Sequence, residues 1–219
     1  MKRTILFSAL LFLFTSLSAQ KISNVDFDAI RKSLDGDPKL YARLTERFRA
    51  GDSSLTYDEY RIIYYGQCFQ KGYNPYGSDS KNSDAFTKKY LAKEFDKALP
   101  YALKMIENNP MDMRMTFKAL VCYHQLKDEA GIAKMKSRYN GIISTIFESG
   151  DGKSDSTAFV VMCVSDEYEL MANMDVEMTS QALVGSCDLM TLKKNDLGLK
   201  ELYFNVSKPL QSMMDMFKK

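Results

Sequence analysis

The residues best suited to contact a ligand form the segment "YYGQCFQKGYNPYG", in which tyrosines alternate with glycines and a proline. Its tyrosines are Tyr64, Tyr65, Tyr73 and Tyr76. A tyrosine offers an apolar ring and a hydroxyl group, which together suit contact with a sugar or a peptide. The same side chains also suit a loop that packs onto its own domain, although long internal loops often carry function. We take these four tyrosines as candidate ligand-binding residues.

A second group of candidate residues is the acidic cluster "SDEYE", which contains Asp166, Glu167 and Glu169. Two carboxyl groups held about 5 to 10 Å apart across a cleft can hydrolyse a glycosidic bond. Acidic residues in the first turn of a helix also have a structural role, because they complement the helix dipole. The structural role is favoured. Asp166 and Glu167 stay candidate ligand-binding residues, and the carboxylates of residues 166–169 define a catalytic alternative.

The segment "GDGKS" at residues 150–154 matches the end of a phosphate-binding loop. Such a loop requires G-x-x-x-x-G-K-[ST] between a strand and a following helix. Phe147 occupies the position of the first glycine, and the patterns on either side predict a helix followed by a strand. A calcium loop fails as well, because Lys153 and Ser156 occupy a ligand position and the required glycine position. The segment is predicted to be a polar turn after a helix that ends at Gly150.

The remaining residues with chemical potential favour structural roles. His124 is the only histidine, and Cys122, two positions away on the same predicted helix, does not face it. The four cysteines lie in or beside apolar runs without a C-x-x-C pair, so buried thiols are favoured over disulfides, although three pairings stay open. Their spacing also disfavours zinc. We therefore predict no cofactor, no metal and no catalytic residue. The cysteines are Cys68, Cys122, Cys163 and Cys187.

The first residues, "MKRTILFSALLFLFTSLSAQK", have the features of an export signal. Lys2 and Arg3 precede an apolar run that is too short to span a bilayer, and small residues follow it. Cleavage is expected after Ala19 or, alternatively, after Ser18, so the protein is predicted to be periplasmic or extracellular. Of 30 basic and 28 acidic side chains, 28 of each would then be left. This neutral balance disfavours nucleic-acid binding, and no integral membrane span is expected in the mature chain.

Residues 24–149 have helical periodicity, interrupted by a polar loop after the tyrosine-rich segment. Thr56 and Glu59 have the spacing of a capping box, in which each side chain satisfies a backbone donor of the other. Asp37 is expected to cap the helix that ends at Gly51.

Within this helical region, "EFDKALPYALKMIENNP" and "FKALVCYHQLKD" resemble one tetratricopeptide repeat. Ala98, Pro110 and Tyr123 fall at positions typical of that repeat, whereas Leu120 stands where the repeat has a small residue. A single repeat cannot form a solenoid, because such units bury their faces only by stacking. The resemblance implies tetratricopeptide-like pairing within a stack of antiparallel helices.

The pattern changes after Gly150. The run "TAFVVMCV" is apolar and rich in β-branched residues, as in a buried strand, and "CDLMTLKKNDLGLKELYFNV" indicates two strands joined by a turn at "KNDLG". Between these segments, "SDEYELMANM" is predicted to form a short helix capped by Ser165 or Asp166, and Pro209 precedes or begins a final helix. The apolar face of this sheet needs a cover, which the preceding helices are expected to supply.

Several short segments occur in a recognisable order: "YYG" followed by "YNPYG", then "STAFVV" with "DEYE", then "LYFNV". In this order they resemble an exported family from Bacteroidetes described as a domain of unknown function, number 4919. The resemblance covers most of the mature chain and implies export from a Gram-negative cell. It implies no catalytic residues, because no activity is assigned to the family.

These patterns predict an exported α+β protein, with an N-terminal helical layer packed on a small, mostly antiparallel C-terminal sheet and a terminal helix. Residues 1–19 form the signal peptide, residues 20–150 the helical region, and residues 151–219 a small α+β region that forms one compact unit with the helices. The favoured function is a non-catalytic binding or protein-interaction module whose ligand is a protein, a peptide or a glycan. The alternative is a hydrolase of glycans or peptides that uses carboxylates of residues 166–169.

Overall fold

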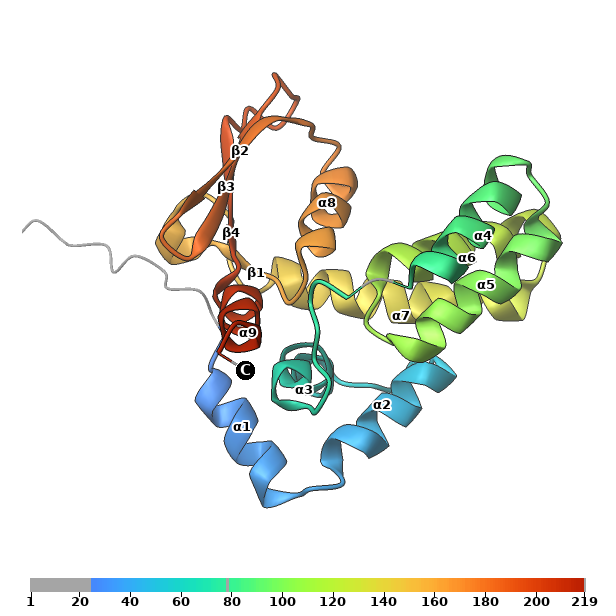
Figure 1. The fold of residues 1–219 in the computed structure, drawn as a ribbon, viewed down its shortest axis with the longest axis horizontal. Helices are drawn as coiled ribbons and strands as arrows, with labels where there is room; N and C mark the ends of the chain where they lie inside the picture. Colours follow the sequence, from blue (N-terminus) through green and yellow to red (C-terminus); the bar gives the residue numbers. More distant parts are fainter. Residues whose placement is uncertain (1–24, 78, 219) are drawn as a thin grey trace, which may run out of the picture.

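The computed structural model describes residues 25–77 and 79–218, so the predicted signal peptide lies outside the described residues. Within the described chain, seven α-helices precede a four-stranded sheet that carries two further helices, which confirms the predicted α+β class (Figure 1). The seven helices are α1 (Phe27–Gly36), α2 (Leu40–Ala50), α3 (Tyr57–Gly66), α4 (Ser80–Leu91), α5 (Phe95–Asn108), α6 (Met113–Leu126) and α7 (Glu129–Phe147), with the 3-10 turn η1 (Gln67–Phe69) after α3.

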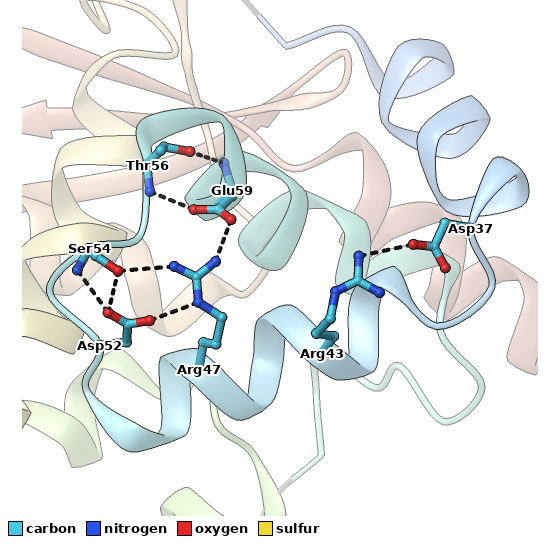
Figure 2. Close-up of polar contacts among 7 residues, drawn as sticks. All are labelled: Asp37, Arg43, Arg47, Asp52, Ser54, Thr56 and Glu59. Carbon is cyan, nitrogen blue, oxygen red and sulfur yellow. Dashed lines mark hydrogen bonds and ion pairs between the residues drawn. The ribbon is translucent and has the colours of Figure 1, made fainter.

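The predicted capping box is present at the start of α3. The Thr56 backbone N–H donates to Glu59 Oε2 at 2.8 Å, and the Glu59 backbone N–H donates to Thr56 Oγ1 at 3.3 Å (Figure 2). Arg47, near the end of α2, bridges Glu59 and Asp52, so the turn between α2 and α3 is held by side chains from both sides. Gly51 ends α2 with a left-handed φ of 75°, as predicted.

The prediction that Asp37 caps α2 is wrong. Helix α2 begins at Leu40, and Lys39 occupies the cap position without a side-chain hydrogen bond. Asp37 instead accepts a hydrogen bond from the Lys39 backbone N–H at 3.0 Å. It accepts another from Arg43 at 2.9 Å (Figure 2). The proline at position 38 keeps Asp37 extended, because the residue before a proline is disfavoured in the helical region.

Helices α4 to α7 pack one after another and enclose a core of their own (Figure 1). Small residues permit the close approach of α6 and α7: a Cβ atom at Gly131 would lie only 2.2 Å from the Tyr123 ring. The buried members of this core are Phe86, Ala98, Ala102, Met105, Ile106, Met115, Ala119, Cys122 and Met135.

The larger core is shared by the first three helices, α7 and the sheet. Helix α7 crosses the middle of the molecule, between the α4–α6 group and the sheet (Figure 1). Its Ile142 and Ile146 are fully buried, and so are Tyr64 and Tyr65 of α3 and Phe204 of the sheet. The helices therefore supply the cover that the sheet was predicted to need.

The chain passes from helix to sheet through a tight corner. Helix α7 ends at Phe147, so the prediction of an end at Gly150 is wrong by three residues. Gly150 is needed for another reason, because a Cβ atom there would lie 2.3 Å from the Thr157 carbonyl oxygen. The Ser149 hydroxyl accepts a hydrogen bond from the Val160 N–H at 2.8 Å and fixes the corner. As predicted, "GDGKS" is a turn between a helix and a strand, the reverse of the order that a phosphate loop requires.

The sheet has the strand order β1-β4-β3-β2. Strand β1 (Phe159–Val160) runs parallel to β4 (Glu201–Asn205). Strand β3 (Cys187–Leu192) pairs antiparallel with β4 and with β2 (Met178–Val184). Antiparallel pairs are therefore in the majority, as predicted.

The predicted turn "KNDLG" joins β3 to β4. Gly198 has a left-handed φ of 68°, which favours glycine. The Asn195 side chain donates to the Leu199 carbonyl at 2.8 Å and accepts from the Leu199 N–H at 3.1 Å, so the turn closes on itself.

Two strands differ from the sequence prediction. The run "TAFVVMCV" supplies only the two-residue strand β1, because the chain then turns toward a helix. Strand β2 was not predicted, since most of its side chains are exposed and lack apolar alternation. It is a strand because its backbone pairs with β3.

Two helices complete the C-terminal region. Helix α8 (Val164–Asn173) has Cys163 at its cap position without a side-chain hydrogen bond, so the predicted caps Ser165 and Asp166 are wrong. Helix α9 (Ser207–Met216) contains Pro209 in its first turn, as predicted.

Candidate functional site

A cleft of about 500 Å³ adjoins the tyrosine-rich segment, a volume within the range typical of ligand pockets. Most of its wall comes from residues 67–77 after α3, residues 105–114 around the α5–α6 connection, and residues 162–163 before α8. Amide side chains are prominent in the lining, and they are Gln67, Gln70, Asn74, Asn108 and Asn109.

A smaller recess of about 200 Å³ adjoins this cleft and shares several lining residues with it. Two carboxyl groups, Asp112 and Asp166, line the recess. The Arg114 guanidinium, the Tyr76 ring and the Cys163 thiol line it as well. The recess thus gathers groups from the tyrosine-rich segment, from α6 and from α8.

Asp166 is the more buried of the two carboxyl groups, with 2% of its surface exposed. The Tyr64 hydroxyl donates a hydrogen bond to Asp166 Oδ2 at 2.6 Å and accepts one from the Met162 N–H at 3.0 Å. Burial raises the pKa of Asp166 to about 7, while the hydrogen bond from Tyr64 opposes the rise and the neighbouring Asp112 adds to it. At neutral pH this carboxyl group can therefore donate or accept a proton.

Asp112 is positioned as the N-cap of α6, where its Oδ1 accepts a hydrogen bond from the Met115 N–H at 2.8 Å. Burial raises the pKa of Asp112, and the Arg114 charge opposes the rise. A hydrogen bond also joins the connection before α6 to α7: the buried Arg138 side chain donates to the Pro110 carbonyl at 2.9 Å. The second carboxyl group of the recess is thus fixed by its own helix.

The predicted tyrosines lie at different depths. Tyr64 and Tyr65 belong to α3, and both side chains are fully buried. Tyr65 donates to the Thr145 carbonyl at 3.1 Å and supports the core. Tyr73 is half-buried and lines the cleft, whereas Tyr76 is 42% exposed and lines the recess. Tyr73 and Tyr76 can thus contact a ligand, and Tyr64 acts on the recess through Asp166.

Glu167 does not line the cleft or the recess. Its side chain is fully buried, and no hydrogen-bond donor of the described residues reaches either carboxyl oxygen. Burial raises the pKa of Glu167 to about 9, and the charge of Asp188 of β3 contributes to this rise. Gln181 of β2 donates to Asp188 Oδ2 at 2.9 Å. Glu167 therefore holds its proton at neutral pH, in a buried position between α8 and the sheet.

Glu169, the third acidic residue of the cluster, is half-buried on α8 beside α7. It accepts a hydrogen bond from the Tyr139 hydroxyl at 3.4 Å, and burial raises its pKa. It lines neither the cleft nor the recess. Of the predicted acidic cluster, only Asp166 reaches the candidate site.

The cysteines and the histidine considered from the sequence differ in how far they are exposed. The four cysteines are free thiols, two of them buried and two half-buried, and burial raises the pKa of each. His124 is exposed on α6. The described residues contain no group of three or more His, Cys, Asp or Glu side chains that could hold a metal ion. None of the described helices combines the length and apolar character that a membrane span requires.

Sequence reasoning missed the contribution of the α5–α6 connection. Asn108, Asn109, Asp112 and Arg114 line the cleft, but they were read only as the end of one helix and the start of the next. The polar segment "ENNPMDMR" could have indicated a ligand-binding role, because it places amide and charged side chains between two amphipathic helices. Its proximity to the tyrosine-rich segment is a tertiary contact that the sequence does not display.

Comparison with known families and structures adds one finding. The family model described as "Domain of unknown function (DUF4919)" matches residues 28–215, which is nearly all of the described chain. No curated protein and no solved structure matches the chain. The family resemblance of the short sequence segments therefore extends over both the helical part and the sheet.

Proposed function

Because the chain belongs to the family described as a domain of unknown function (DUF4919), we propose its function from the cleft alone. We propose a non-catalytic binding module that holds a glycan or peptide ligand in this cleft. The observation that carries the proposal is the lining itself: amide side chains, tyrosine rings and carboxyl groups from distant segments of the chain face one space of about 500 Å³ with its adjoining recess.

The lining suits a ligand that is rich in hydroxyl or peptide groups. Each amide side chain offers both a donor and an acceptor, and so matches either kind of group. Tyr73 and Tyr76 add apolar ring surface of the kind that contacts sugar rings and peptide side chains. Since burial raises the pKa of Asp166 to about 7, its carboxyl group can also donate a hydrogen bond as a neutral acid. The cleft also has charged side chains of both signs, namely Lys71, Arg114, Asp79 and Asp112. This balance favours a ligand without a strong net charge.

The cleft is held in shape without a ligand, which favours affinity because little ordering is left for the binding step. The Tyr73 hydroxyl donates to the Met162 carbonyl at 2.7 Å. The Cys163 thiol donates to the Pro75 carbonyl at 3.1 Å. The tyrosine-rich segment is thus bonded to the chain before α8 at two positions, Tyr73 and Pro75.

The test is an array of glycans and peptides probed with the purified chain. The variant Tyr76→Ala with Asn109→Ala removes two lining side chains; the hydrogen bond that Asn109 Oδ1 accepts from the Met111 N–H, at 3.3 Å, is local to the α5–α6 connection. We expect affinity for any captured ligand to fall about tenfold or more. The matched control, Tyr101→Ala with Gln125→Ala, changes an exposed tyrosine and an exposed amide outside the cleft. Equal losses in both variants, or no loss in the first, would contradict the proposal.

A hydrolase is the second candidate, because Asp112 and Asp166 both face the recess. A general acid needs a pKa near the working pH, and Asp166 meets this condition. The second catalytic carboxyl group would be Asp112, and not Glu167 or Glu169, because neither of these lines the recess. Turnover of a glycan or peptide by the wild type, lost in folded Asp166→Asn, would favour this candidate over binding alone.

We also propose that the chain works outside the cytoplasm, as the export signal and the resemblance to exported proteins from Bacteroidetes suggest. The mature chain would then begin at Gln20. Mass spectrometry of the protein recovered from periplasm and medium tests this. A chain that retains Met1 in those fractions would contradict it.

The pairing of α5 with α6 is proposed to follow the tetratricopeptide geometry. Ala98 and Ala119 are both fully buried in the core that these helices share, which supports a close approach of the two helices. The boundary between a helical region and an α+β region at residue 150 is likewise proposed, and the shared larger core supports one compact unit.

A further inference from the structure

A second pocket, of about 370 Å³, adjoins the tyrosine-rich segment but is formed with α1 and α9. Gln70, Gly72 and Tyr73 line both this pocket and the cleft. Helix α9 contributes polar side chains at helical spacing, so that one face of the helix is directed to the pocket. These side chains are Lys208, Gln211, Ser212 and Asp215.

Two cations of this pocket gather on one aromatic ring. The Arg31 guanidinium lies 5.6 Å from the centre of the Phe69 ring, and the Lys208 ammonium lies 5.7 Å from the same centre. Lys208 also lies 4.7 Å from the centre of the Phe27 ring. Aromatic faces attract cations, and here one ring has two like charges, each within about 6 Å of its centre.

The pKa of the Cys68 thiol is affected by the same two cations. It lines the pocket, and burial raises its pKa to about 11. The charges of Lys208 and of Arg31 both oppose this rise. Both charges therefore act on the thiol that lines the pocket.

Carboxylates within the described residues neutralise these cations only in part. Arg31 has Asp35 at 3.8 Å, with both side chains largely exposed to water. Asp215, the only acidic residue that lines the pocket, pairs with Lys218 at 3.4 Å. No carboxylate of the described chain lies within 4.0 Å of the Lys208 ammonium. The pocket is therefore lined by more basic than acidic side chains, in a protein whose basic and acidic residues are nearly equal in number.

Hydrogen-bond donors are available beside the two cations. The side chains of Gln211 and Ser212 line the pocket and bond to no other side chain or backbone group in the described part of the chain. Gln70 makes one long bond of 3.4 Å to the Gly66 carbonyl. A ligand could engage all three without breaking a strong internal contact.

We propose that this pocket binds an oxyanion, namely a carboxylate, sulfate or phosphate group carried by a larger ligand. The guanidinium and the ammonium form charge-assisted hydrogen bonds with the anion, and its charge relieves their mutual repulsion. The amides and the Ser212 hydroxyl complete its coordination. The site is independent of the proposed cleft function, because it uses different charged residues and a different ligand group.

The experiment titrates the purified chain with sodium sulfate, sodium phosphate and sodium acetate at constant ionic strength, followed by NMR shifts of the backbone amides of α9. We expect saturable binding that weakens about tenfold or more in Arg31→Gln with Lys208→Gln. The control Lys32→Gln with Lys194→Gln removes the same charge from exposed lysines outside the pocket and should bind as the wild type does. Preference for acetate over the tetrahedral anions assigns a carboxylate ligand, and the reverse assigns a sulfate or phosphate.

A second variant covers the case in which loss of both charges disturbs the fold. Gln211→Ala with Ser212→Ala keeps Arg31 and Lys208 and removes only neutral donors. We expect it to weaken binding about threefold or more. The proposal is overturned if no anion saturates the wild type. It is also overturned if every variant of this pair that folds binds the anion as tightly as the wild type does.

Discussion

At the scale of single residues, the recess depends on the hydroxyl group of Tyr64. This group is buried and connects α3 to the Asp166 carboxyl group and to the Met162 backbone. Its donor and acceptor functions are both used, so neither partner is left unpaired in the core. The hydroxyl also stabilises the charged form of Asp166, which opposes the rise in pKa that burial causes.

Tyr64→Phe tests this role because it keeps the ring and removes the hydroxyl. The Met162 N–H and the Asp166 carboxyl group would lose their partner inside the core. We expect the free energy of unfolding to fall by about 1–3 kcal/mol and the pKa of Asp166 to rise. Urea unfolding measures the first quantity, and the pH dependence of the Asp166 carboxyl resonance measures the second.

The matched control is Tyr168→Phe, which removes an exposed hydroxyl that donates to Gln181 at 3.2 Å. Its stability should stay within about 0.5 kcal/mol of the wild type. A Tyr64→Phe protein as stable as this control would show that the buried hydroxyl has no such role.

At the scale of elements, the contact between α8 and the sheet contains two acidic groups. Glu167 is fully buried and faces Asp188 of β3, which Gln181 of β2 holds in place. Asp166 of the same helix adds a smaller electrostatic effect. Two ionised carboxylates would repel each other, so this packing requires a proton on Glu167.

The pKa of Glu167 rises from its ordinary value of 4.5 to about 9 in the folded chain. Between these two values the folded state binds this proton and the unfolded state does not. The contribution of Glu167 to stability therefore falls as the pH rises through that window. Glu167→Gln removes the titration and leaves an amide that can donate to Asp188.

We expect thermal unfolding to show a growing advantage of Glu167→Gln over the wild type as the pH increases from about 5 to about 9. The comparison between the two proteins cancels the other titrating groups. A difference that is constant across this range would contradict the raised pKa of Glu167. Asp175→Asn, at an exposed acidic position after α8, serves as the control and should show no such trend.

The turn between α2 and α3 is a second element-scale feature with a clear test. Thr56→Ala removes the side chain that accepts from the Glu59 N–H and opens the capping box (Figure 2). We expect a loss of about 1 kcal/mol in the free energy of unfolding. Ser53→Ala, at an exposed position in the same turn, should change it by less than about 0.5 kcal/mol. Equal effects from the two substitutions would exclude a capping role.

At the scale of the whole molecule, two cores meet along α7. One core belongs to α4–α7, and the other is shared by α1–α3, α7 and the sheet. The corner after α7 sets the position of the sheet relative to the helices (Figure 1). Because Gly150 lies against the backbone of residues 157 and 158, this corner cannot open without moving β1.

Gly150→Ala places a methyl group where the Thr157 carbonyl oxygen lies, and backbone atoms cannot rotate away as a side chain can. We expect a loss of about 3 kcal/mol in the free energy of unfolding, measured by urea titration. In Gly36→Ala the new methyl group meets nothing within 4 Å, so stability should change by no more than about 1 kcal/mol. Similar effects at both glycines would show that the corner is not tightly packed.

The sequence predicted those features that depend on neighbours within a few residues. The capping box at Thr56 and Glu59, the end of α2 at Gly51 and the turn at Asn195 to Gly198 all follow from local hydrogen bonds and backbone preference. The free state of the cysteines agrees with their apolar surroundings. Helix boundaries were predicted less accurately, as the C-terminal end of α7 and the N-terminal cap of α8 show. The reason is that tertiary packing helps to decide where a helix begins and ends.

The amino-acid sequence by itself determined the α+β class, the main helices, the β3–β4 hairpin and the family, because periodicity and turn chemistry act along the chain. Only the tertiary structure brought Tyr64 onto Asp166, across 102 positions, and placed the α5–α6 connection beside the tyrosine-rich segment. It likewise made an exposed segment into strand β2 through its partner β3. The physical reason is that burial, shifted pKa values and clefts depend on contacts between distant segments, which local conformational preference does not encode.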